Sequence, residues 1–176
     1  MVLKRFEKDG MIACVDVHYR GEDAVAACIL FRDWPDAAGI GHRIEYVRGV
    51  RQYEPGRFYL RELPCLLAVL RKMTDPLECI VIDGYVWLGE EASPGLGAHL
   101  FQTLGCSVPV IGVAKSRFRA AGTAREVFRG GSGRPLYVTA AGIDPDDAAR
   151  CIRNMHGGHR IPTLLRQVDR LCRSGS

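Results

Sequence analysis

Two aspartates stand inside apolar stretches of the kind that form buried strands. Asp16 lies in the run Cys-Val-Asp-Val at 14–17, and Asp83 ends the run Ile-Val-Ile-Asp at 80–83. Burying a carboxylate costs several kcal/mol per ion unless a partner compensates its charge. Two such residues on separate predicted core strands therefore indicate a site that needs a positive charge.

A third carboxylate, Glu62, lies between the two aspartates in the sequence. It belongs to a predicted helix in which leucines recur at helical spacing. The helix begins either near Arg61, where Pro64 falls in its first turn, or at Phe58, where Pro64 would kink it. Glu62 lies four residues before Leu66, so both share the inward face of this helix.

The three carboxylates meet at one end of a sheet if the strands of Asp16 and Asp83 are neighbours. Their mutual repulsion then favours a divalent cation, and hard carboxylate oxygens suit Mg²⁺, with Mn²⁺ as a substitute. Each residue alone has a simpler explanation. Asp83 can form an Asx turn with Gly84, and Asp16 can be a partnered core carboxylate. Glu62 can be a residue that the helix dipole favours, but the three together are harder to explain without a cation.

The elements that would position these residues follow from hydrophobic periodicity and turn signals. The predicted strands cover 11–19, 24–34, 41–50, 79–83 and 108–114, with a further candidate at 135–140. Helices are predicted over the leucine-rich segment that contains Glu62 and at 94–104, 144–154 and 162–172. The basic, Gly-rich stretch 115–134 is expected to be a loop. The order predicts an α/β fold of the ribonuclease-H-like kind, with a mixed five-stranded sheet and helices on both faces. We expect one domain over residues 1–176.

The composition is that of a globular protein. Of the 176 residues, 47% are hydrophobic and 25% charged, which is enough for a core. No window approaches the apolar length of a membrane span, and the first ten residues lack the apolar block of a secretory signal. The seven cysteines are scattered without metal-ligand spacing, which argues against zinc or disulfides and fits a reducing compartment. We expect a cytoplasmic protein with no membrane partner.

The net charge of +4 permits a polyanionic partner, and the placement of the charges says more. Arginine outnumbers lysine, and its planar fork suits phosphate oxygens. The basic residues crowd two stretches, one with Arg43, Arg48, Arg51, Arg57 and Arg61 and one with Lys115, Arg117, Arg119, Arg125, Arg129 and Arg134. Solvated loops would explain either stretch as well, so charge alone leaves the partner open.

Four groups of motifs resemble those of the endonuclease V family, and the match runs from about residue 11 to residue 170. The first is Cys-Val-Asp-Val-His-Tyr at 14–19, and the second is Tyr-Glu-Pro-Gly at 53–56 followed by Arg-Glu-Leu-Pro at 61–64. Ile-Asp-Gly at 82–84 is similar to the third. The fourth is Gly-Leu-Gly-Ala-His-Leu at 95–100 with Val-Pro-Val-Ile-Gly-Val-Ala-Lys-Ser at 108–116. The motifs most specific to this family are Gly-Val-Ala-Lys-Ser and the second group.

This resemblance implies a metal-dependent endonuclease that hydrolyses a phosphodiester near a deaminated purine. The lesion would be deoxyinosine in DNA, or inosine in RNA, and the products a 3′ hydroxyl and a 5′ phosphate. The resemblance implies that Asp16 and Asp83 hold the metal ion, with Glu62 completing the acidic cluster. Lys115 would bind the scissile phosphate or orient water, unless it is an ordinary strand-end lysine.

The resemblance also implies contacts with nucleic acid. Tyr53 would wedge into the duplex beside the lesion, because an aromatic face can replace lost base stacking. Its alternative is a packed loop aromatic. The remaining implied contacts come from the loop around Tyr53, from glycines whose amides would line a base pocket, and from two polar residues: Pro55, Gly56, Gly84, Gly112, Ser116 and His159. His159 begins a stretch similar to the family's C-terminal aromatic-Arg-Leu-Pro, but it can equally be a surface histidine.

The sequence departs from the family pattern in two places. Residues 85–90 read Tyr-Val-Trp-Leu-Gly-Glu where the family continues toward His-Pro-Arg, and 141–143 read Ala-Gly-Ile where it has Gly-His-Arg. Two alternatives stay open: a ribonuclease-H-like nuclease of other specificity, and a non-catalytic nucleic-acid-binding relative. The Tyr-x-Pro-Gly loop argues against the first, and the three retained carboxylates argue against the second. We expect the chain to act as a monomer.

Overall fold

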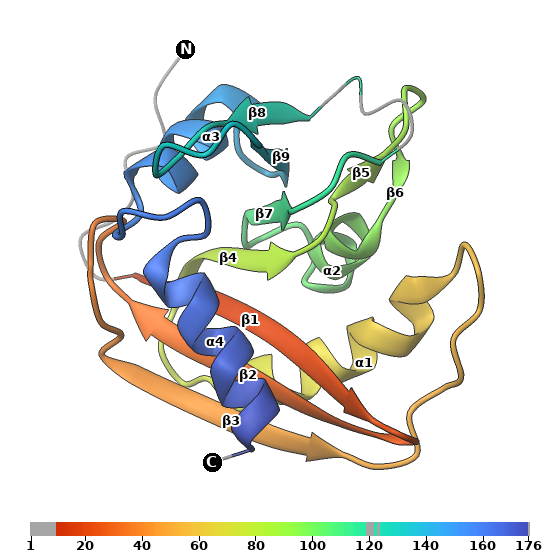
Figure 1. Ribbon diagram of the computed structural model, residues 1–176. Coiled ribbons are helices and arrows are strands. Elements are labelled where there is room, and N and C mark those ends of the chain that lie inside the picture. The colour runs from red at the N-terminus through yellow and green to blue at the C-terminus, as the bar shows by residue number, and fades with distance from the viewer. Residues whose placement is uncertain (1–9, 119–121, 123, 176) are drawn as a thin grey trace.

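The computed structural model describes residues 10–118, 122 and 124–175. Its main element is a seven-stranded sheet with the order β3-β2-β1-β4-β7-β9-β8 (Figure 1). The strands are β1 Met11–Arg20, β2 Asp23–Phe31, β3 Gly41–Val47, β4 Leu77–Asp83, β7 Val110–Ala114, β8 Arg125–Val127 and β9 Leu136–Ala141. A small hairpin is formed by β5 Trp87–Leu88 and β6 Ser93–Pro94.

The pairing of the strands confirms the predicted meander and the predicted neighbours. β1, β2 and β3 pair antiparallel in succession, and β4 lies parallel to β1, with β7 parallel to β4. The five predicted strands are therefore adjacent, but five is too few for the whole sheet. The candidate at 135–140 forms β9, and β8 arises within the stretch that was expected to be a loop. β8 has three residues, too short for a recognisable alternation.

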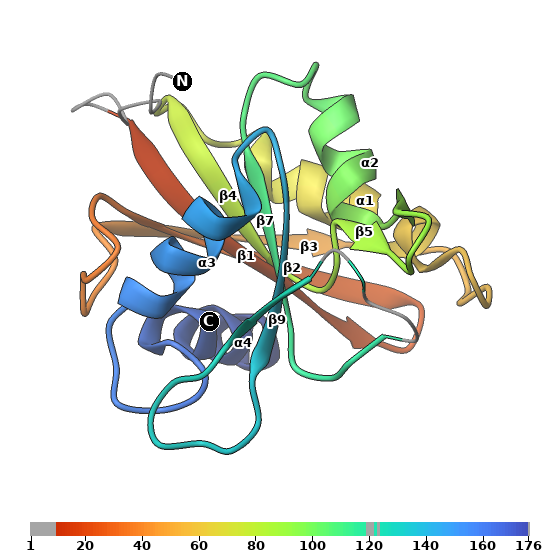
Figure 2. The ribbon, with the colours of Figure 1, turned by 90° about the horizontal axis from the view of Figure 1, so that it is seen from above.

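Helices cover both faces of the sheet, as predicted. One face carries α1 Phe58–Leu70 and α2 Leu96–Thr103, and the other carries α3 Pro145–Asn154 and α4 Thr163–Ser174 (Figure 2). The buried residues divide in the same way into two hydrophobic clusters, one under each pair of helices. Five of the seven cysteines are buried in these clusters, as small apolar residues are.

Local signals explain where two helices begin. The Asp144 side chain accepts the backbone N–H groups of Asp146 and Asp147 at 2.9 and 3.2 Å, and Pro145 takes the first position of α3. α1 begins at Phe58, the earlier of its two predicted starts, so Pro64 lies inside it. The helix nevertheless continues to Leu70, where its apolar side packs on the sheet.

The loop between α3 and α4 is held by a buried arginine. The Arg129 guanidinium donates to backbone carbonyls of this loop, including that of Gly157 at 3.2 Å and that of Met155. Carbonyls that lie outside regular elements are satisfied in this way. Of the second basic stretch, Arg119 lies outside the described residues. None of the helices in the described part combines the length and the apolarity that crossing a bilayer requires.

Candidate active site

The sheet register brings Asp16 and Asp83 side by side. β1 and β4 run parallel with Val15 opposite Ile82, and the two aspartates are the next residue on each strand. Since side chains alternate along a strand, both carboxylates lie on the same face, the one that α3 and α4 cover. The predicted meeting of the two aspartates therefore follows from the register, and it lies where β4 ends, within the length of β1.

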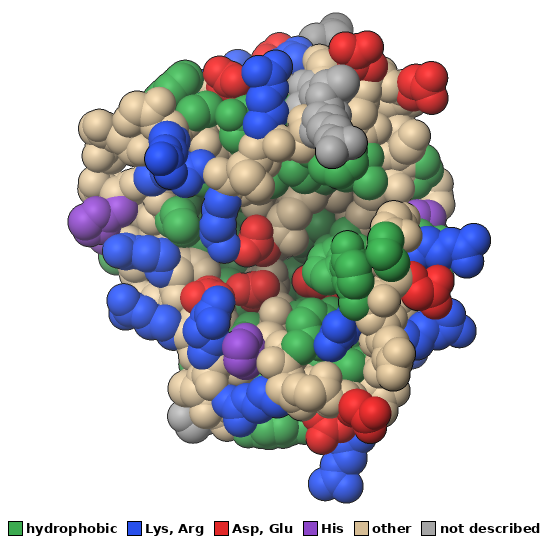
Figure 3. Space-filling model, turned by 45° about the vertical axis from the view of Figure 1, so that its right-hand side comes forward, with side chains coloured by type: hydrophobic (Ala, Val, Ile, Leu, Met, Phe, Trp, Pro, Cys, Tyr) green, Lys and Arg blue, Asp and Glu red, His purple; other side chains and the backbone are tan. Residues whose placement is uncertain are grey.

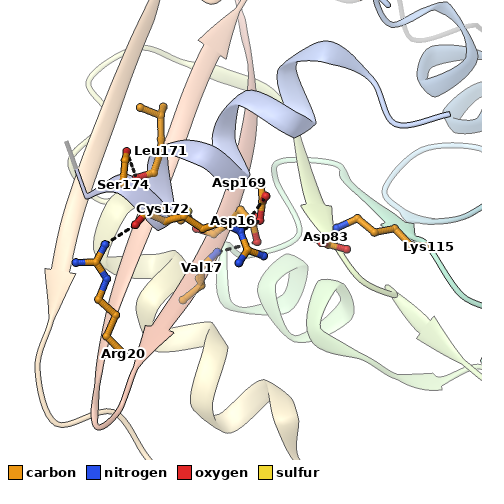
Figure 4. Close-up of polar contacts among 10 residues, drawn as sticks. Asp16, Val17, Arg20, Asp83, Lys115, Asp169, Leu171, Cys172 and Ser174 are labelled. Atoms are coloured by element: carbon orange, nitrogen blue, oxygen red, sulfur yellow. Dashed lines mark hydrogen bonds and ion pairs between the residues drawn. The ribbon is translucent and has the colours of Figure 1, made fainter. Parts of the chain in front are cut away.

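Lys115 reaches the same point from the neighbouring strand. It follows the last residue of β7, and its Nζ lies 2.5 Å from Asp83 Oδ2 (Figure 4). Burial lowers the pKa of Lys115, but the hydrogen bond and the charge of Asp83, with the charge of Asp16, outweigh burial and raise it. The amine is therefore held in its charged form.

These three residues line one small pocket of about 20 Å³. Its other walls are apolar and come from β1, β7, β9 and the region of α4: Val15, Val113, Leu136, Ile161, Leu165 and Val168. A space of this size holds about one water molecule. Polar groups thus line a pocket whose other walls are apolar, a setting that strengthens charge interactions.

Glu62 approaches from the other layer of the fold. It lies on α1, only 5% of its surface is exposed, and its Oε2 has no hydrogen-bond partner among the described residues. Burial, and then the charges of Asp16 and Asp83, raise its pKa to about 8. Burial and the charge of Asp83 likewise raise the pKa of Asp16 to about 7. The three predicted carboxylates therefore repel one another in this arrangement.

The donor set fits a hard divalent cation in its chemistry. Within the described ranges, no three His, Cys, Asp or Glu side chains are gathered closely enough to form a ready metal site. Asp16 and Asp83 share the pocket, whereas Glu62 is coupled to them by charge from the opposite face. Carboxylate oxygens with raised pKa values, one of them unpartnered in the described structure, are what a cation would stabilise.

A fourth carboxylate, Asp169, was not predicted from the sequence. It lies on α4 beside Asp16 (Figure 4), and its charge raises the pKa values of Asp16 and Lys115. It also accepts Arg173 Nε at 3.0 Å. An Asp–Arg pair four residues apart is common on solvated helix faces, so this spacing did not indicate that Asp169 lies at the site. The sequence feature that could have indicated it is its position directly after Val168, which is one of the buried residues of α4.

The loop between β3 and α1 exposes Tyr53, the residue predicted to act as a wedge. Tyr53 is 59% exposed, and its ring centroid lies 6.3 Å from that of Phe58. Arg57 N–H donates to the Glu54 carbonyl at 3.0 Å across Pro55 and Gly56, and Gly56 has φ 77°. Proline followed by a residue with positive φ is the pattern of a type II turn, which requires glycine there. The turn projects the aromatic side chain into solvent.

The two glycines of the predicted base pocket have another role. The Gly84 N–H donates to the Val113 carbonyl at 3.0 Å, and Gly112 is buried in β7 between β4 and β9. A Cβ on Gly112 would lie 2.5 Å from the Gly84 carbonyl oxygen. Gly112 is needed because two chain segments touch there, whereas Gly84 is needed because its φ of 129° disfavours any residue with a side chain. These are roles in the fold, and the expected contact of the two glycines with a base stays a prediction.

The last two predicted contacts lie at the surface near Lys115. Ser116 is exposed, and its carbonyl accepts the Tyr85 hydroxyl at 2.8 Å. His159 is also exposed, on the loop between α3 and α4, and its carbonyl accepts Arg129 at 3.2 Å. The structure does not bring the His159 side chain into the pocket with the carboxylates.

Charged side chains are unevenly spread over this side of the molecule. Figure 3 shows acidic side chains gathered in the hollowed centre of one face, with Lys and Arg side chains around them. The loop that carries Tyr53 adds exposed arginines, namely Arg48, Arg51 and Arg57. A basic surround with an acidic centre suits a polyanion whose backbone crosses a cation site.

Comparisons with known proteins give a consistent result. A family model described as Endonuclease V matches residues 2–170. An endonuclease V of Streptomyces coelicolor is 30% identical over 192 aligned residues, which cover 94% of this chain and 78% of the relative. The crystal structure of endonuclease V from Streptomyces avermitilis matches with a TM-score of 0.75 and 26% identity, over 96% of this chain and 82% of that one.

A more distant structure agrees in fold. Endonuclease V of Ciona intestinalis, crystallised with a 24mer DNA that contains an inosine followed by a ribo-adenosine, matches with a TM-score of 0.74 and 17% identity. The match covers 96% of this chain and 86% of that one. The fold of these proteins is ribonuclease-H-like, which confirms the fold predicted for this chain.

Proposed function

The chain belongs to the endonuclease V family, whose members are nucleases acting on nucleic acids, and on that premise we propose that it is a divalent-metal-dependent endonuclease. It would hydrolyse a phosphodiester bond near a deaminated purine. The observation that supports this proposal is the meeting of Asp16 and Asp83 side by side on neighbouring strands, with Glu62 on the opposite face repelled by both. Such a cluster is costly unless a cation binds it.

We assign Asp16, Asp83 and Glu62 as the residues that would hold Mg²⁺, or Mn²⁺ in its place. When bound, the ion supplies a water of lowered pKa and stabilises charge on the phosphoryl oxygens. The contribution of the protein is to hold the three carboxylates near one another, Asp16 and Asp83 on neighbouring strands and Glu62 on α1. The raised pKa values of Asp16 and Glu62 mean that metal binding and loss of protons are linked.

Lys115 is the residue that would bind the scissile phosphate. Its raised pKa keeps the amine protonated at neutral pH, so it acts as a positive charge and hydrogen-bond donor and not as a base. Its contact with Asp83 places that charge at the mouth of the acidic pocket. A phosphate oxygen that replaced Asp83 as its partner would lie next to the ligand set.

The proposed substrate is deoxyinosine in DNA, with inosine in RNA as a second substrate of the same site, and the products are a 3′ hydroxyl and a 5′ phosphate. The relative from Ciona intestinalis binds DNA that contains inosine, which supports this choice. In this chain the exposed Tyr53 would fill the gap beside the lesion. Exposed arginines near it would contact the phosphate backbone.

The proposal is tested by cleavage of an oligonucleotide that carries one inosine, with Mg²⁺ or Mn²⁺. We expect Asp16→Asn and Asp83→Asn each to lower the rate by orders of magnitude, because each removes a charged ligand without changing the volume of the side chain. Asp75→Asn is the matched control, since Asp75 is exposed before the opposite end of β4. Undiminished cleavage in both site variants would refute the proposal. Binding of the duplex without cleavage by the wild-type chain would instead support the nucleic-acid-binding alternative.

A further inference from the structure

Tyr85 ties the segment after Lys115 to the segment after Asp83. Its hydroxyl donates to the Ser116 carbonyl at 2.8 Å and accepts the Phe118 N–H at 3.0 Å. Its ring also lies against Phe118, with centroids 6.0 Å apart. Burial raises the pKa of Tyr85, so the hydroxyl stays protonated and can keep donating. One side chain thus fixes two backbone groups of a surface segment.

The place of this contact matters because the regular sheet ends just before it. The pairing of β4 with β7 ends at Asp83 and Val113, and the Gly84 N–H makes a last bond to the Val113 carbonyl. Lys115 lies beyond that point, where the backbone has left the sheet. A lysine on a loosely held backbone samples many positions, and fixing it costs conformational entropy.

Two side chains from different parts of the fold hold the backbone around Lys115. Arg160, from the loop between α3 and α4, donates to the Lys115 carbonyl and, at 2.7 Å, to the Pro135 carbonyl. Tyr85 secures the next residues from the β4 side. The Lys115 amine can then rest on Asp83 with its backbone already fixed, which is the arrangement that preorganised sites use.

We propose that Tyr85 is a positioning residue that holds the turn after β7 and thereby keeps the Lys115 amine at the carboxylate site. This inference rests on the proposed function, in which Lys115 binds the scissile phosphate. Tyr85 itself touches neither Lys115 Nζ nor Asp83 in the described contacts; it acts through the backbone of Ser116 and Phe118. Its effect should therefore depend on the presence of the Lys115 amine.

Tyr85→Phe removes the hydroxyl and keeps the ring. We expect kcat on an inosine oligonucleotide to fall about 10-fold, the low end of what supporting contacts contribute, with little change in KM. In a Lys115→Ala background the same substitution should cost nothing further, because coupled residues are not additive. An equal loss of kcat in both backgrounds would overturn the proposal. So would an unchanged kcat in the single variant.

Tyr46→Phe is the matched control. Tyr46 also donates its hydroxyl to a backbone carbonyl, that of Gly175, but it lies on β3 at the far edge of the sheet. We expect this variant to keep the wild-type kcat. A loss of kcat equal to that of Tyr85→Phe would overturn the proposal, because it would show that any lost tyrosine hydroxyl has this effect.

Hydrogen exchange of the Phe118 amide separates this proposal from the proposed function. We expect the amide to exchange at least several-fold faster in Tyr85→Phe than in the wild type, at equal thermal stability. Unchanged exchange would overturn the proposal whether or not the protein cleaves DNA. If the wild type cleaves no inosine substrate, the proposed function has failed, while faster exchange would still support the hold that Tyr85 exerts on this segment.

Discussion

Glu62 places a carboxylate where burial away from water and the charge of neighbouring carboxylates both disfavour ionisation. Its pKa is about 8 in the folded chain, because of burial and the charges of Asp16 and Asp83, whereas an unfolded glutamate has a pKa of about 4.3. Between these values the folded state keeps a proton that the unfolded state releases. The contribution of Glu62 to the free energy of unfolding is therefore fully present below the pKa of the unfolded state. It is lost as the pH rises through the pKa of the folded state.

We expect Glu62→Gln to remove this loss. In the absence of divalent cations, the melting temperature of the variant should rise relative to that of the wild type as the pH increases from about 5 to about 9, because glutamine has no charge to bury. Melting curves by circular dichroism across this range measure the difference. Glu126→Gln, on an exposed position of β8, is the control and should follow the wild type. A constant offset between Glu62→Gln and the wild type would contradict the charge argument.

The carboxylates on strands and on the inward face of a helix were predictable, whereas two other residues were not. Asp16 and Asp83 can be recognised in the sequence by their apolar neighbours, because a buried strand leaves a local pattern of apolar residues. Asp169 and Tyr85 act across the fold, from a helix 153 residues after Asp16 in one case and through a hydroxyl bond over 31 residues in the other. Such contacts depend on how loops close, which local spacing does not encode.

At the scale of elements, α3 is the helix whose start is best specified. Asp144 accepts two N–H groups of the first turn, which would otherwise have no partner in the helix. We expect Asp144→Ala to lower the free energy of unfolding by about 1 kcal/mol, as loss of a cap does, and to leave cleavage unchanged. Urea unfolding measures it. Asp144→Ser keeps a capping oxygen and should lie close to the wild type; an equal loss in both variants would show that the cap is not the cause.

Element predictions succeeded where the pattern was long and failed where it was short. The five strands and four helices that the periodicity indicated all occur, and the start of α3 was found to the residue through Asp144. β5 and β6 have two residues each, and no periodicity can be read from two. Contacts with β9 hold the start of this segment in place. The Val86 N–H donates to Thr139 Oγ1 at 2.8 Å, and the Trp87 indole donates to the Ala140 carbonyl.

The sheet separates two hydrophobic layers, and the acidic cluster takes carboxylates from both sides of it. Asp16 and Asp83 lie on the face that α3 and α4 cover, and Glu62 comes from α1 on the opposite face. Their charges interact across the end of the sheet. A cation held by all three would join the two layers. Binding should therefore stabilise the folded chain as a unit, and the gain should depend on the protons that the carboxylates must release.

We expect Mn²⁺ or Mg²⁺ at about 100 times its dissociation constant to raise the melting temperature by about 5 to 10 °C, since binding to the folded state alone adds about 2.7 kcal/mol. With the metal concentration chosen at about pH 8.5 and then held fixed, the rise should be smaller at about pH 6, because Asp16 and Glu62, with pKa values of about 7 and about 8, must lose protons to bind a cation. Differential scanning fluorimetry with metal and with EDTA measures it. Asp75→Asn should keep the rise. The double variant Asp16→Asn and Asp83→Asn should lose it, and a rise that survives there would place the cation elsewhere on the protein.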